Sequence, residues 1–171
     1  ILINRYKRTN GYNEGVFFYF KNIKNKQIWS NIYSENVQEY KTIFTADMSQ
    51  TVITNDNIKT KIKTIIAPND NVEIRNIKIN NNGNIEEILE ASTVLEPVLS
   101  TENQDYAHKA FNNLFLKYEE IENGILIKRN NRGYEKEVFF AVGFFADKGN
   151  IEKIEYEIDK QTLYGRLNYN I

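Results

Sequence analysis

Apolar and polar positions alternate along much of this 171-residue chain, and that period of two is typical of strands rather than helices. The clearest run is Ile58–Thr64, where isoleucine and threonine hold one face and three lysines hold the other. Such a pattern is typical of an antiparallel strand with one face in the core and one in water. Similar short runs recur between turn signals, so the sequence predicts an all-β protein.

Turn signals divide the chain into about ten short strands. Val16–Phe20 and Gln27–Ser30 flank a short polar connector and are expected to form a hairpin. Ile85–Leu95 carries helix-compatible glutamates, but its β-branched end favours a strand. Val138–Ala146 is apolar at successive positions, which predicts a strand covered on both faces. Ile151–Ile158 alternates again and is predicted to be the last strand.

The alternation of apolar and polar residues changes phase within the segment Val72–Ile79. Val72 and Ile74 belong to one alternation, whereas Ile77 and Ile79 belong to the other. An extra residue in the strand would explain the change, so a β-bulge is expected near Asn76. With no convincing helix elsewhere, the pattern predicts an antiparallel β-sandwich that forms one domain over residues 1–171.

Composition narrows the range of functions. The 22 Lys and Arg residues nearly balance 23 Asp and Glu residues, and the pI is near 6.0, so nucleic acid is not expected as a partner. There is no cysteine and one histidine, which argues against disulfides and transition-metal sites, and no cofactor is predicted. The sequence contains neither an apolar run of about 20 residues nor a signal-peptide pattern at its start.

The single histidine, His108, lies in the segment Asp105–Glu120, where polar residues give way to an alternating apolar run from Leu114. We expect an irregular loop that carries His108 to the mouth of a strand. Imidazole can bond a sugar hydroxyl or transfer protons near neutral pH. A structural role, in which the ring ties its loop to the sandwich through hydrogen bonds, is the favoured interpretation.

Exposed aromatic rings are a second candidate chemistry, because sugars dock on them through their C–H faces. Tyr106 is the best surface candidate since its neighbours are polar, while Trp29 is expected to lie mostly in the core. Adjacent or alternating acids such as Glu119 and Glu120 could supply a carboxylate pair for glycoside chemistry. Solvated strand faces explain these acids better, so no catalytic residue is predicted.

Short motifs follow one another along almost the whole chain. They are Asn4–Lys7, Gly15–Phe20, Gln27–Ser30, Ala67–Arg75, His108–Phe115, Tyr156–Lys160 and Tyr164–Arg166. In this order they resemble segments of the cellobiose-phosphorylase-like family, which includes cyclic β-1,2-glucan synthases and oligoglucan phosphorylases. The sequence departs from the family's His-Pro-Ala-Phe-Ser segment at Lys109, in place of proline, and at Asn112, in place of serine.

The resemblance implies a galactose-mutarotase-like supersandwich beside an (α/α) barrel that carries the catalytic acid. It implies a non-catalytic domain that packs on this barrel and helps shape a glucan site, within an enzyme that phosphorolyses or synthesises β-glucans. Expected partners are a glucan oligosaccharide bound by the whole enzyme, the barrel of the same polypeptide, and a second copy in a homodimer. Family sandwiches extend beyond both ends of the matched region, so the chain is expected to be an excised domain truncated at both ends.

Four residues are the candidates for carbohydrate or domain-interface contacts: Arg5, Trp29, Tyr106 and His108. Two alternatives stay open, an autonomous carbohydrate-binding module and a subunit-interaction domain that binds no sugar. The expected location is the bacterial cytoplasm, with any membrane attachment of the whole protein supplied elsewhere in it.

Overall fold

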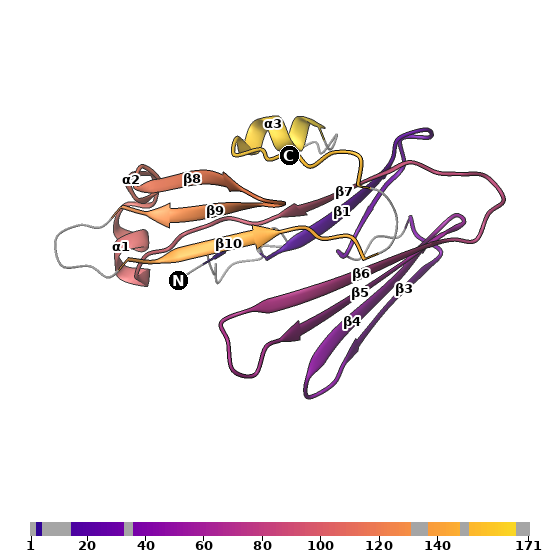
Figure 1. Ribbon diagram of the computed structural model, residues 1–171, viewed down its shortest axis with the longest axis horizontal. Coiled ribbons are helices and arrows are strands. Elements are labelled where there is room, and N and C mark those ends of the chain that lie inside the picture. Colours follow the sequence, from indigo (N-terminus) through magenta and orange to yellow (C-terminus); the bar gives the residue numbers. More distant parts are fainter. Residues whose placement is uncertain (1–2, 5–14, 33–35, 131–136, 148–150, 167–171) are drawn as a thin grey trace. The chain divides into compact units, whose positions relative to one another are not determined.

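The structure is a computed structural model that describes residues 3–4, 15–32, 36–130, 137–147 and 151–166 (Figure 1). Within these residues antiparallel strands predominate and the helices are short, which confirms the predicted all-β class. The strands are β1 (Phe17–Asn22), β2 (Ile28–Ser30), β3 (Glu39–Phe44), β4 (Met48–Asn55), β5 (Ile58–Ile66), β6 (Glu73–Asn81), β7 (Leu89–Val94), β8 (Leu116–Ile121), β9 (Gly124–Arg129) and β10 (Phe139–Gly143). The helices are α1 (Glu102–Ala107), α2 (Lys109–Asn113) and α3 (Lys160–Arg166).

The chain divides into two compact units. One is Phe17–Val94, and the other combines Ile1–Val16 with Leu95–Ile171. The first unit holds two sheets, with strand orders β2-β1-β7 and β3-β4-β5-β6. The second holds one sheet, with order β10-β9-β8. The assignment of residues 1–171 to a single domain stays a prediction.

The two sheets of the Phe17–Val94 unit enclose a hydrophobic core, as a sandwich requires. Its buried members are Phe18, Phe20, Trp29, Ile53, Ile58 and Ile62. The ring of Trp29 stacks on Phe20 with 5.7 Å between ring centroids, and its Nε1 donates a 3.1 Å hydrogen bond to Oγ1 of Thr60. These two buried polar groups are therefore paired with each other across the two sheets.

Most predicted strands of this unit are confirmed. The expected first hairpin forms between β1 and β2, with Tyr19 opposite Ser30. Along β5, the isoleucine and threonine positions from Ile58 to Ile62 face the core, and Lys61 and Lys63 are exposed. The segment in which helix and strand competed forms β7, which pairs with β1.

The predicted bulge is wrong. The pairing of β5 with β6 keeps one register on both sides of Asn76, with Ile74 opposite Ile65 and Ile77 opposite Ile62. Ile77 packs against the core, whereas Ile74 is 49% exposed on the outer face. The change of phase in the sequence therefore reflects apolar residues on both faces of one regular strand.

Two predictions for the other unit also fail. The segment predicted to be covered on both faces forms β10, in which Phe139 is 52% exposed. Ile151–Ile158 forms no strand, and Ile158 is 67% exposed. Alternation alone does not supply the neighbouring strand that pairing requires. None of the helices in the described part of the chain has the length and apolar character needed to cross a bilayer.

Candidate functional site

The segment around His108 is helical rather than irregular. Helix α1 begins with a reciprocal cap, in which Oγ1 of Thr101 accepts the N–H of Gln104 and Oε1 of Gln104 accepts the N–H of Thr101. His108 lies between α1 and α2, and β8 starts only at Leu116. The expected loop leading into a strand is therefore wrong, because the Thr101 capping box starts a helix here.

The four predicted site residues separate in the structure. Tyr106 is 93% exposed and His108 is also exposed, and both lie in the α1–α2 segment. Trp29 is 2% exposed in the core of the other unit, as expected, and offers no ring face to a ligand. Arg5 lies outside the described residues. A hydrogen-bonding role for the His108 side chain stays a prediction.

Exposed apolar side chains follow these two residues in the sequence. We define the helix surface as Tyr106, His108, Phe111 and Leu114. Phe111 is 47% exposed and Leu114 is 76% exposed. The ring of His108 meets Phe111 edge-on, at 6.4 Å between ring centroids. These exposed apolar side chains make this segment a candidate interaction surface.

A buried arginine fixes α2 to the sheet. The guanidinium of Arg129, in β9, donates a 3.1 Å hydrogen bond to Oδ1 of Asn112 and lies 5.5 Å from the ring centroid of Phe115. Asn112 is itself 2% exposed, and its Nδ2 has no hydrogen-bond partner. The carboxamide oxygen must face the cation, so the orientation of the amide is set by Arg129.

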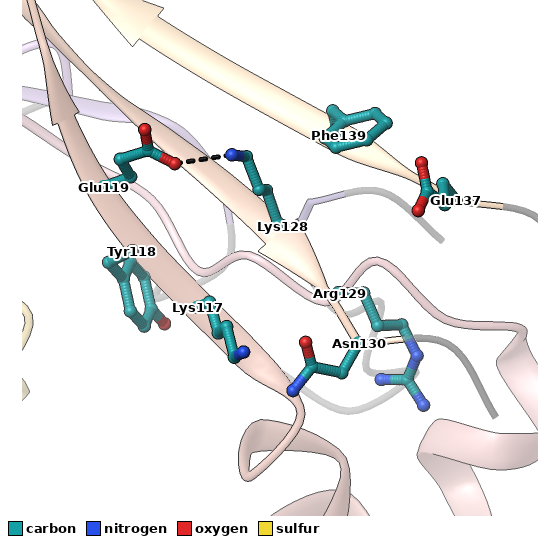
Figure 2. A pocket seen from close by; sticks show the side chains of 8 residues that line it. All are labelled: Lys117, Tyr118, Glu119, Lys128, Arg129, Asn130, Glu137 and Phe139. Atoms are coloured by element: carbon teal, nitrogen blue, oxygen red, sulfur yellow. Dashed lines mark hydrogen bonds and ion pairs between the residues drawn. The ribbon is translucent and has the colours of Figure 1, made fainter.

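A second site lies on the sheet of strands β8, β9 and β10 (Figure 2). It is a hollow of about 460 Å³, which we call the β8–β10 groove. Its lining residues are Lys117, Tyr118, Glu119, Lys128, Arg129, Asn130, Glu137 and Phe139. The register places Lys117, Lys128 and Phe139 opposite one another across the three strands. These three side chains therefore share one face of the sheet.

Charges in the groove nearly cancel. Lys128 forms an ion pair with Glu119 across β8 and β9, as Figure 2 shows. Lys117 and Glu137 add one charge of each sign, and the guanidinium of Arg129 is engaged with Asn112. Sequence reasoning considered Glu119 as part of a carboxylate pair but favoured a solvated acid, and it did not single out Phe139. The register that unites the lining residues joins strands that a local pattern cannot align.

Burial, and then the negative charge of Glu96, raise the pKa of Tyr118 above its ordinary value of 10.0. Because the folded state holds the phenolic proton more tightly, the resulting stabilisation is complete below pH 10 and is lost as the pH rises through the folded pKa. Glu96→Gln is expected to lower the Tyr118 pKa toward 10. Titration of ¹³C-labelled tyrosine by NMR measures it. Glu122→Gln is the control, and an equal change in both variants would contradict the assignment to Glu96.

Among the residues that the structure describes, no group of three or more His, Cys, Asp or Glu side chains is arranged to hold a metal ion.

Comparison with known proteins identifies the class of this sandwich. The sequence pattern of the family described as "Glycosyl hydrolase 94, supersandwich domain" matches residues 3–169. The chain belongs to this family, as its resemblance to cellobiose-phosphorylase-like proteins predicted. It is also 26% identical, over 128 residues, to the cyclic beta-(1,2)-glucan synthase NdvB of Rhizobium meliloti (strain 1021). That match covers 73% of this chain and 4% of the relative, so the chain corresponds to a small part of that protein.

Proposed function

We propose that this chain is a non-catalytic domain of a glucan phosphorylase or a cyclic β-glucan synthase. It packs on the (α/α) catalytic barrel of the same polypeptide and helps shape one side of the glucan site. The family membership and the relative's name support a β-glucan as the substrate class. The whole protein is proposed to be bacterial and cytoplasmic, with any membrane attachment provided by its other parts.

The helix surface is the observation that carries this proposal. Tyr106 and Leu114 are mostly exposed, and Phe111 is about half exposed. Full burial of an apolar side chain of this size stabilises a contact by roughly 1.5–3 kcal/mol. The hydrogen bond from Arg129 to Asn112 holds α2 in place, so little order has to be gained on docking. His108 lies among these residues and can donate a hydrogen bond to a carbonyl or a sugar hydroxyl.

A charge placed in this surface tests the proposal in the whole protein. Leu114→Glu is expected to raise the KM for glucan and to expose the junction to proteolysis, because a carboxylate cannot be buried there unpaired. The variant chain should keep its circular dichroism spectrum, since Leu114 is 76% exposed.

Phe44→Glu is the matched control, because Phe44 is 77% exposed in the other unit. It should leave both KM and proteolysis unchanged. If Leu114→Glu behaves like this control, the helix surface does not contact the barrel and the proposal fails.

A subunit-interaction domain is the alternative that the same surface favours. In that case the 171-residue chain would show a mass that rises with concentration in light scattering, and Leu114→Glu would abolish the rise. A constant monomer mass would remove this alternative and leave the contact with the barrel.

A further inference from the structure

We propose that the β8–β10 groove is itself a binding site for a neutral oligosaccharide, with Phe139 as the ring on which a sugar stacks. This inference rests on the proposed function for the class of sugar, a β-glucan. It adds the place of binding and the residues that make it. The helix surface and the groove then have different tasks, contact with the barrel and contact with the glucan.

The sheet register gives the groove the layout of a sugar site. Lys117, Lys128 and Phe139 lie in one row across β8, β9 and β10. Neighbouring strands are about 4.8 Å apart, so this row spans roughly 10 Å, a length comparable to a disaccharide. Glu137 lines the groove two residues before Phe139, just ahead of β10, and Glu119 lies two residues after Lys117 in β8. Hydrogen-bonding groups therefore flank an exposed ring.

The lining carries charges of both signs, which favours a neutral ligand. Three cationic side chains, of Lys117, Lys128 and Arg129, line the groove together with two carboxylates, of Glu119 and Glu137. An anion attracted by the lysines would also be repelled by the two acids. A polyhydroxylated ligand satisfies both kinds of group, because its hydroxyls accept from ammonium and donate to carboxylate.

Stability of the sheet does not explain these side chains. The side chains of Lys128 and Glu119 are 37% and 59% exposed, and ion pairs that are this exposed stabilise proteins only weakly. Lys117 lies directly opposite Lys128, and like charges in that position destabilise a strand pair. Phe139 is 52% exposed. A bound sugar would cover the ring and accept hydrogen bonds from both lysines.

The hollow has a suitable size. Its volume of about 460 Å³ lies within the range of sites for small ligands, roughly 300–1,000 Å³. Asn130 also lines the groove, where Figure 2 shows it next to Arg129, and adds a carboxamide that can both donate and accept.

NMR titration of the ¹⁵N-labelled 171-residue chain tests the site, with β-1,2-linked glucan oligosaccharides, β-1,4-linked glucan oligosaccharides and inorganic phosphate as separate probes. We expect saturable shifts with one of the two glucans, confined to amides of β8, β9 and β10. Phe139→Ala should weaken that binding by roughly tenfold or more, because the stacking ring is removed. Phe139→Tyr should retain it, and Phe44→Ala should leave it unchanged.

Three results would overturn the inference. They are no shift with either glucan, saturable binding of phosphate alone, or glucan binding that Phe139→Ala leaves intact. The proposed function is tested separately by Leu114→Glu, which should leave glucan binding by the 171-residue chain unchanged. If Leu114→Glu disrupts the contact with the barrel and no glucan shifts appear in the NMR titration, the proposed function stands and the groove is not a glucan site.

Discussion

Phe20→Ala is expected to lower the free energy of unfolding of the Phe17–Val94 unit by about 3–5 kcal/mol, because it leaves a cavity in a closed core. Phe20 has no exposed surface, and its ring stacks on Trp29. Ile53 and Ile62, from the facing sheet, belong to the same core cluster. The strands around the cavity are held by main-chain pairing and can collapse into it only in part.

Urea unfolding followed by tryptophan fluorescence measures this loss. Trp29 is the single tryptophan of the chain and lies in this core, so its emission reports on this unit. Phe44→Ala is the matched control, since Phe44 is 77% exposed, and its effect should stay within about 0.5 kcal/mol. Equal shifts of the two urea midpoints would show that Phe20 does not support the core.

Features of the fold that repeat along a single strand could be predicted from the sequence. In β5, alternation named Ile58, Thr60 and Ile62 as the inward residues, and all three are buried. The physical reason is that successive side chains of a strand point to opposite faces. Burial of one face therefore requires an apolar residue at every second position. The hairpin of β1 and β2 was predicted from another local signal, two β-rich runs that flank a short polar connector.

Features that depend on distant parts of the chain could not be predicted in this way. Alternation in Ile151–Ile158 predicted a strand. A strand also needs a neighbouring strand to pair with, and the pattern within one segment does not show whether such a neighbour exists. Ile74 suggested a bulge because an apolar residue on the outer face looks locally like a change of phase. The helix α1 left a readable signal, the capping pair Thr101 and Gln104, that the sequence prediction did not use.

The same distinction between local and long-range features applies to the candidate sites. Tyr106 was predicted to lie at the surface because its neighbours are polar, and it is 93% exposed. The β8–β10 groove was not predicted, because Lys117, Lys128 and Phe139 come together only through the register of three strands. None of its lining residues carries a sequence signal of a binding site, and it is their position on one face of the sheet that suggests a function.

Gly124→Ala is expected to destabilise the sheet that carries this groove by about 2–3 kcal/mol, the upper part of the range for overpacked sites. A Cβ at Gly124 would lie 2.4 Å from the carbonyl oxygen of Val142, which belongs to the paired strand β10. Both clashing groups are tied to the backbone, so the start of β9 must move away from β10. Thermal unfolding by circular dichroism, with hydrogen exchange of the β9 and β10 amides, measures the effect.

Gly165→Ala is the matched control for this substitution. Gly165 lies in α3, and a Cβ there would meet no atom within 4 Å. The change should stabilise the helix by up to about 1 kcal/mol, since alanine loses less backbone entropy than glycine on forming a helix. The two substitutions add the same methyl group, so the opposite signs isolate the close approach of β9 and β10. Unchanged exchange rates in Gly124→Ala would mean that the strands are not in such close contact, and the layout of the groove would fail with it.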